Sequence, residues 1–197
     1  MRKLIEELEK FAGPLVEARG ARPDDFFSKG ILPDGSKWRD TPKLFFAAGN
    51  TEPTIKKAKP TNQGGIIHYS ADVDFAPGKG GGGGISIDPT ASNQYFNMVG
   101  TGRKQIKAFG SAMQKAAKRN SRTINAQIEQ YFRKEFFWRV VGYEKRNKYV
   151  VSDVTFRKID YRPADVDPTR RRWPSGRTEA WMPVKTKVMM VIKPKGV

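Results

Sequence analysis

The chain has 197 residues, contains no cysteine and carries a formal net charge of +17 at pH 7. The absence of cysteine excludes disulfides, thiol nucleophiles and thiolate metal sites, and the length allows the chain to bury a core of its own. The first ten residues are acidic and amphipathic and no long apolar run occurs, so we expect neither a secretory signal nor a membrane partner.

The positive charge is concentrated in the C-terminal half of the chain. Residues 1–100 carry 13 Lys and Arg against 12 Asp and Glu, whereas residues 101–197 carry 24 against 8. A distribution this one-sided favours a polyanion or an acidic protein surface as the partner. The alternative is a charged face that only keeps the protein soluble.

The first hundred residues begin with an expected amphipathic helix over 1–19, in which Leu4, Leu8 and Phe11 form one apolar stripe. Residues 20–65 contain five prolines and six glycines and are interpreted as an extended loop. A loop of this length is unusual inside a compact domain, which favours a segment that lies across a partner subunit.

Residues 66–75 alternate apolar and polar side chains and predict a strand with one buried face. A glycine run over 80–84 follows, and then a short apolar segment over 85–87. We interpret the two strands as a hairpin with a flexible tip.

Residues 103–138 have helical periodicity, which predicts one kinked helix or two helices divided near Asn120. Strands are expected over 138–144, 148–158 and 180–193, the last with Val188–Ile192 buried on both faces. The polar residues 162–178 between the last two form an expected hairpin arm. The fold class is therefore α+β, an antiparallel sheet packed against helices within a core of residues 66–197.

Two groups of cations are candidate binding residues. The first lies on the polar face of the predicted helices and centres on Lys115, Lys118, Arg119 and Arg122. The second lies in the expected arm and comprises Arg170, Arg171, Arg172, Trp173 and Arg177. Arginine beside tryptophan suits both single-stranded nucleic acid and protein interfaces, and a solvated loop is the alternative.

A possible anion site precedes the basic helix, where Gly100, Gly102, Arg103 and Lys104 combine free backbone amides with two cations. A simple connecting loop is the favoured alternative. The segment Gly78-Lys79-Gly80 is not a phosphate-binding P-loop, because that motif requires Ser or Thr after the lysine and a helix after the loop.

A metal site is the remaining catalytic candidate. Asp72 and Asp74 share a strand face with His68, the single histidine of the chain, and this set suits Mg²⁺ or Mn²⁺ in a nuclease. The same alternation describes the ordinary solvent face of a strand, so we expect no metal and no cofactor. No nucleophile elbow of the Gly-x-Ser-x-Gly type occurs, and we expect no enzymatic activity.

The basic helical stretch Arg103–Phe136, followed by a short sheet with a long hairpin loop, resembles the neck and tail-completion proteins of tailed bacteriophages. The resemblance covers residues 100–197, and Thr101-Gly102 is similar to a pair found in one such group, although there the pair follows the long helix. It implies a ring-forming virion subunit at the head–tail connection, without catalysis. Some ribosomal proteins share the same basic, cysteine-poor profile.

We therefore expect a non-enzymatic structural subunit of a phage particle that binds copies of itself and other structural proteins, with a basic face that contacts DNA or RNA or acidic neighbouring subunits. An RNA-binding protein of a ribosome or ribonucleoprotein is the alternative, and a metal-dependent nuclease is a second alternative. The expected location is the virion, or the cytoplasm if the protein is not viral.

Overall fold

The computed structural model describes residues 22–48, 52–76, 83–166 and 180–197. The chain divides into two compact units, each assembled from three separate segments. The first comprises the described parts of Met1–Leu44, Ile87–Arg119 and Pro163–Ala180, and the second comprises those of Phe45–Ser86, Asn120–Arg162 and Trp181–Val197. The expected division at residue 66 differs from this arrangement, and the expected helix over 1–19 lies outside the described residues.

The first unit consists of helices with local start and stop signals. Helix α2 (Pro23–Lys29) has proline at its start and ends at Gly30, whose φ of 69° lies in the left-handed region. Helix α3 (Pro89–Val99) is capped by Asp88, whose carboxylate accepts hydrogen bonds from the backbone N–H groups of Thr90 and Ala91. Helix α4 (Arg103–Arg119) and the 3₁₀ turn η3 (Pro163–Asp165) complete the unit.

An aromatic cluster forms the core of the first unit. Phe109 of α4 packs against Phe96 and Tyr95 of α3 with ring centroids 4.6 and 4.8 Å apart, and against Phe27 of α2 at 5.1 Å. Gly110 follows Phe109 and lets α4 approach η3, because a Cβ at this position would lie 2.0 Å from the carbonyl oxygen of Pro163.

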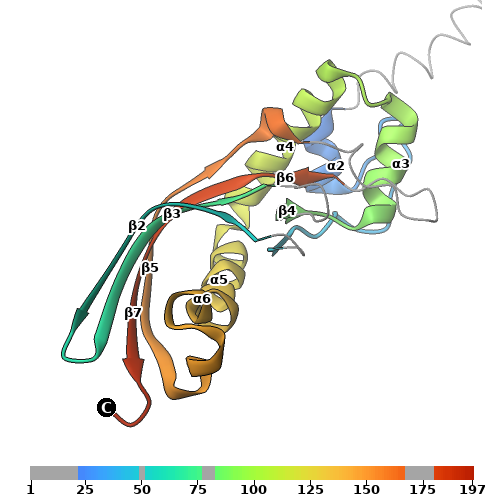
Figure 1. Cartoon of the computed structure of the whole chain (residues 1–197). Coiled ribbons are helices and arrows are strands. Elements are labelled where there is room, and N and C mark those ends of the chain that lie inside the picture. Colours follow the sequence, from blue (N-terminus) through green and yellow to red (C-terminus); the bar gives the residue numbers. More distant parts are fainter. Residues whose placement is uncertain (1–21, 49–51, 77–82, 167–179) are drawn as a thin grey trace, which may run out of the picture. The chain divides into compact units, whose positions relative to one another are not determined.

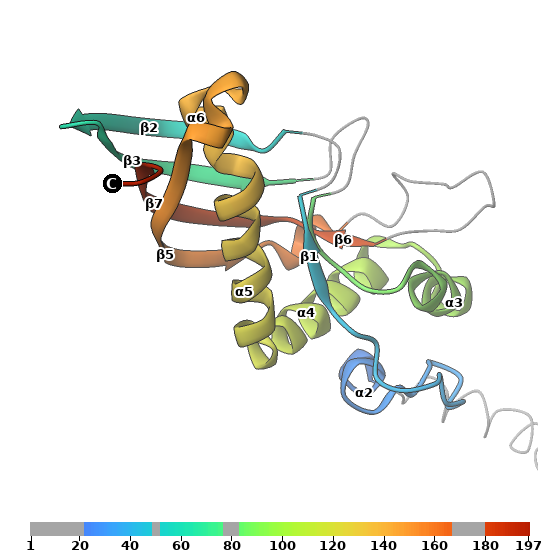
Figure 2. The ribbon, with the colours of Figure 1, turned by 90° about the horizontal axis from the view of Figure 1, so that it is seen from below.

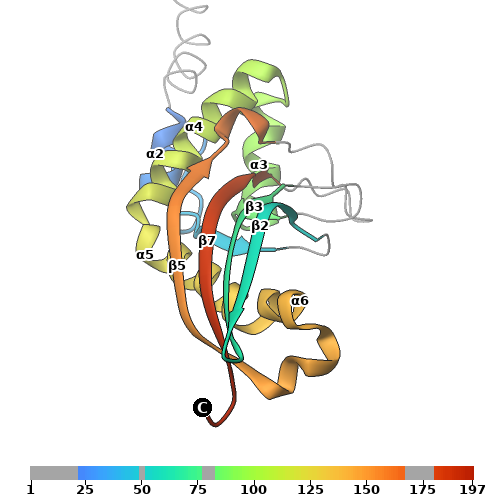
Figure 3. The same ribbon diagram turned by 60° about the vertical axis from the view of Figure 1, so that its left-hand side comes forward.

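The second unit contains two antiparallel sheets. The larger has the strand order β2 (Thr54–Gln63), β3 (Ile66–Phe75), β7 (Val184–Pro194) and β5 (Tyr149–Tyr161), shown side by side in Figure 3. The smaller has the order β1 (Phe45–Ala47), β4 (Gly84–Ser86) and β6 (Trp181–Met182). The antiparallel α+β class predicted from the sequence is confirmed.

Helices cover one face of the larger sheet. Helix α5 (Ser121–Tyr131) continues through the π-helical turn η1 (Phe132–Phe136) into α6 (Phe137–Val141), and the 3₁₀ helix η2 (Tyr143–Lys148) leads into β5 (Figure 1). Rings from this layer pack on rings of the sheet, with Phe132 and Tyr131 centred 6.1 and 5.5 Å from Phe75. The alternate residues of β3 and β7 that face the helices form the core of this unit.

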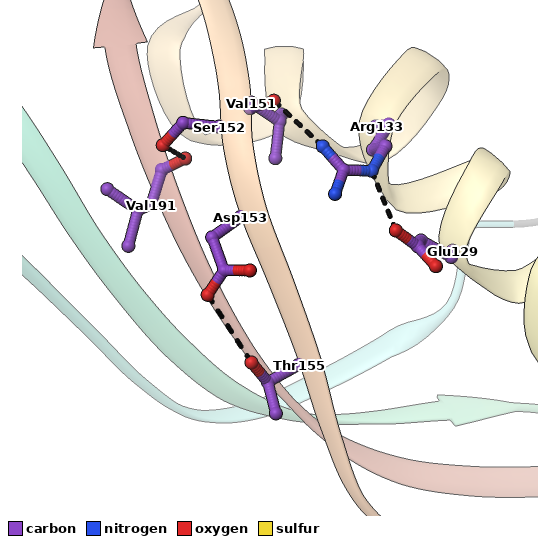
Figure 4. Close-up of polar contacts among 7 residues, drawn as sticks. All are labelled: Glu129, Arg133, Val151, Ser152, Asp153, Thr155 and Val191. Carbon is purple, nitrogen blue, oxygen red and sulfur yellow. Dashed lines mark hydrogen bonds and ion pairs between the residues drawn. The ribbon is translucent and has the colours of Figure 1, made fainter.

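Two polar contacts fix the helical layer to neighbouring strands. Strand β1 runs beside α5, and Phe46 donates its backbone N–H to Oε1 of Gln127 at 2.7 Å (Figure 2). Arg133 in η1 donates to Oε1 of Glu129 and to the carbonyl oxygen of Val151, each at 2.9 Å (Figure 4). Val151 precedes a bulge in β5, so the arginine satisfies a carbonyl where the strand pairing is irregular.

Several expected elements differ in the structure. The segment 20–65 is not a continuous loop, because it contains α2, β1 and β2. Strand β2 is exposed on both faces along its length. Its sequence therefore lacks the alternation of apolar and polar residues that identifies a half-buried strand. Helix α3 was not expected, although its Asp-Pro start is a helix signal.

Three strand expectations are also corrected. The segment 85–87 does not form a hairpin with 66–75, because β4 pairs with β1 and β6 while β3 pairs with β2 and β7. The segment 138–144 is helical, since its apolar residues continue the helical layer from Phe136. Val188–Ile192 is not buried on both faces, because Met189 and Val191 point away from the helices and are half-buried.

We expect two buried tyrosines to make each unit sensitive to alkali. Burial raises the pKa of Tyr95 in the first unit and of Tyr131 in the second from 10.0 to about 12. A raised pKa in the folded state means that the stabilisation is present below pH 10 and is lost as the pH rises towards 12. Denaturant unfolding at stepwise higher pH should therefore give a falling free energy over that interval.

The variant Tyr131→Phe separates the two contributions. The hydroxyl of Tyr131 is buried and has no hydrogen-bond partner among the described residues, so its removal should leave stability at pH 7 unchanged or higher. Absorbance titration of the variant should lose one late-ionising tyrosine. A loss of more than about 1 kcal/mol at pH 7 would show that this hydroxyl is hydrogen-bonded.

We expect Gly110→Ala to destabilise the first unit by about 1–3 kcal/mol, because the new methyl group would overlap a backbone carbonyl that cannot move freely. Gly102→Ala is the matched control, since its methyl group would meet only the flexible side chain of Gln105. Equal melting temperatures for both variants would contradict the close approach of α4 to η3.

Candidate binding surfaces

The face of the larger sheet that points away from the helices is the first candidate surface, which we name the open face. Strand register places Thr61, His68, Val191 and Asp153 in one row across the four strands, and Lys59, Ser70, Met189 and Thr155 in the next. A third row contains Lys56, Asp72, Lys187 and Arg157. The open face therefore has an apolar centre on β7 between polar flanking strands.

The first two rows line a hollow of about 460 Å³. Met189 and Val191 lie at its centre, and Lys59 and Asp153 bring opposite charges from the two edge strands. Asp153 accepts a hydrogen bond from the Thr155 hydroxyl at 3.5 Å, and the Ser152 hydroxyl donates to the carbonyl oxygen of Val191 at 3.2 Å (Figure 4). These contacts hold Asp153 and Ser152 in place beside the hollow.

The two aspartates considered as candidate metal ligands are paired with cations. The guanidinium of Arg162 donates to Asp74 at 2.8 Å, and Lys57 Nζ lies 3.9 Å from Asp72 Oδ2. Lys57 sits in a bulge of β2 with a left-handed φ of 53°, a local distortion that redirects a side chain. Both carboxylates therefore have partners within the chain.

His68 shares the strand face of the two aspartates, as predicted, but lies too far along β3 to join them. Four residues separate His68 from Asp72, which corresponds to about 13 Å along a strand. Ligands of one metal ion lie only about 2.0–2.6 Å from it. In the described residues, no group of three or more His, Cys, Asp or Glu side chains is arranged to hold a metal ion.

Both edges of the larger sheet carry features that oppose strand addition. Strand β2 presents Lys56, Lys57, Lys59 and Pro60, and it is interrupted by the bulge. Strand β5 has two irregularities, one at Ser152 and one between Arg157 and Asp160. Lysine, proline and bulges at an edge hinder pairing with another chain, so the open face is better suited to contact than either edge.

The second candidate surface is the solvent side of α4, which we name the basic face. Its cations are Arg103, Lys104, Lys107, Lys115, Lys118 and Arg119, and all six are exposed. At about 100° per residue they occupy roughly 160° of the helix circumference, opposite the buried Phe109 and Met113. Lys115 lies 3.1 Å from Asp24 Oδ2 of α2, whereas the other five form no ion pair within the described part of the chain.

The residues of the predicted anion site lie together at the connection between α3 and α4. Gly100 ends α3 with a φ of 79°, and the carbonyl oxygen of Gly102 accepts the first hydrogen bond of α4 from Ile106. Gln105 Oε1 occupies the space beside Gly102, where a Cβ would lie 2.6 Å from it. We therefore treat Arg103 and Lys104 as part of the basic face and propose no separate anion site.

The remaining predicted binding residues are divided among different places. Arg122 is exposed on α5 and belongs to the second unit, whereas Lys115, Lys118 and Arg119 belong to the first. Arg170, Arg171, Arg172, Trp173 and Arg177 lie outside the described residues. The open face was missed by sequence reasoning, although the alternation of lysine with apolar residues from Val184 to Val188 gave a signal for it.

Comparison with protein-family models, with curated proteins and with solved structures finds no match. None of the helices in the described ranges combines the length and the apolar character needed to cross a membrane. The geometry and charge of the two surfaces are therefore the features that bear on function.

We expect millimolar Mg²⁺ or Mn²⁺ to leave the melting temperature unchanged, because Asp72 and Asp74 already pair with cations and His68 is distant. Thermal unfolding in chelator and in metal checks this expectation. A rise in melting temperature that Asp72→Ala with Asp74→Ala abolishes would establish a metal site and restore the nuclease alternative.

Proposed function

We propose that this chain is a non-enzymatic structural subunit that assembles with copies of itself into a closed ring. The observation that carries the proposal is the open face, which the described residues leave uncovered, with its hollow centred on Met189 and Val191. Half-buried apolar side chains framed by polar ones are typical of the centre of a protein interface. The helices cover the other face of the sheet, which leaves this one accessible to a partner.

The two edges of the larger sheet, which oppose strand addition, support a ring rather than a fibre. Strand addition at an unprotected edge leads to open-ended assembly, and β2 and β5 both carry features that oppose it. A contact between the open face of one copy and a different surface of the next is heterologous, and such contacts close into rings when the rotation between copies allows it.

The proposed place of this ring is the head–tail connection of a tailed bacteriophage, in the neck, tail terminator or connector. The resemblance of residues 100–197 to neck and tail-completion proteins supports that location. The charge concentrated in the same half of the chain is compatible with a channel that carries DNA or with acidic neighbouring subunits.

We expect size-exclusion chromatography with light scattering to give a discrete oligomer for the full chain, and Met189→Glu to convert it to monomer. The substitution places a charge in the centre of the open face, where a neighbouring copy would have to desolvate it. Met98→Glu is the matched control, because Met98 is 43% exposed on α3, in the other unit.

A protein that stays monomeric at all concentrations would overturn the ring. An oligomer that survives Met189→Glu and dissociates with Met98→Glu would move the interface away from the open face. Mass spectrometry of purified virions tests the location separately, because a ring absent from virions would retain the assembly proposal and remove the phage particle.

A further inference from the structure

We propose that the basic face of α4 binds the phosphate backbone of a double-stranded nucleic acid without reading its sequence. This inference depends only on the residues of α4, and it stands whether or not the chain forms a ring. The basic face contains six exposed cations and no acidic residue, since α4 has no Asp or Glu over its 17 residues.

The distribution of positive charge along α4 supports this inference. Seventeen helical residues extend about 24 Å, which matches roughly seven base-pair steps of a duplex. Cations lie near both ends of the helix, at Arg103 to Lys107 and at Lys115 to Arg119, so one side presents a positive strip made of two groups about 12 Å apart. The buried side of the same helix holds Phe109, Met113 and Ala116 in the core of the first unit, which fixes the strip towards solvent.

The absence of aromatic and large apolar side chains from the strip also supports the inference. Between its cations the basic face holds Gln114, Ser111 and Ala108, with no aromatic and no large apolar side chain. Single-stranded nucleic acid is bound by stacking bases on aromatic rings, which this face cannot offer. Protein interfaces are held by central anchors that are most often Trp, Tyr or Arg, and the middle of this face, between Lys107 and Lys115, holds none of them.

The side chains that form the basic face are suited to contacts with phosphate oxygens. Lysine, arginine, glutamine and serine side chains are the usual donors to phosphate oxygens. Five of the six cations form no ion pair within the described part of the chain, so their charge is available for phosphates. Because backbone contacts carry no sequence information, binding should be independent of base sequence.

The test measures binding of a fluorescent duplex of about 30 base pairs to the full chain, with DNA and RNA duplexes as parallel arms, between about 50 and 200 mM salt. The variant replaces Lys104, Lys107, Lys118 and Arg119 by glutamine, which keeps the helix propensity high. The matched control replaces Lys134, Lys145, Lys148 and Lys195 by glutamine, because these four exposed lysines lie in the second unit, outside the rows of the open face, and give the same change in net charge.

We expect the wild-type chain to bind the duplex with a steep salt dependence. The α4 variant should bind on the order of a thousandfold more weakly at about 0.1 M salt, with a slope reduced by about 3–4. The control should remain within several-fold of wild type. The arm that binds more tightly identifies the duplex as DNA or RNA.

Three results would overturn the inference. The first is an equal loss of affinity in the two variants, and the second is tighter binding of a single strand than of either duplex. The third is no duplex binding at the lowest salt, and this third result would leave an acidic protein surface as the partner. Should the α4 variant fail to fold, lysine acetylation of the wild-type chain provides a second test. Duplex should protect Lys104, Lys107 and Lys118 and leave Lys145 and Lys148 reactive, and uniform reactivity would refute the proposal.

Discussion

The register between β3 and β7 is the constraint on which the second unit depends. It places Tyr69 opposite Met190 and Ala71 opposite Val188, so that the buried residues of both strands face the same side. The rings of Tyr131, Phe132 and Phe136 fill that side, and Phe136 lies 6.0 Å from Tyr69 between ring centroids. Since side chains alternate along a strand, a shift by one residue would exchange the core with the charged open face. The same register therefore creates both the core and the open face.

In the first unit, the packing of one helix likewise determines both the core and the exposed surface. The apolar side of α4 is fixed by Phe109 and Gly110 against α2, α3 and η3, and this leaves all six cations on the opposite side. Neighbouring cations repel one another, so the charge of α4 by itself slightly destabilises the folded unit. Asp24 compensates Lys115, and Lys118 and Arg119 interact favourably with the negative end of the helix dipole. The remaining repulsion is what an anionic partner would relieve.

The two surfaces differ in the kind of contact that they offer. Two of the carboxylates on the open face, Asp72 and Asp74, pair with Lys57 and Arg162. The pKa values that burial raises to about 12 belong to Tyr95 and Tyr131, both of which lie in aromatic cores. The open face and the basic face belong to separate compact units, so the proposed assembly role would have two independent contacts.

The sequence by itself determined the elements whose pattern depends on one buried face. Strand β3, the helices over 103–138 and the basic face all follow from periodicity, because alternate or helical spacing records which side is dry. Tertiary structure decided what periodicity does not record. Strand β2 is wet on both faces, β4 pairs with β1 and β6 although β3 is nearer in sequence, and each unit draws on three distant segments. His68 and Asp72 share a face in the pattern, and only distance along the strand separates them. Contacts between residues far apart in the chain carry no local signal, and this is why the open face required the structure.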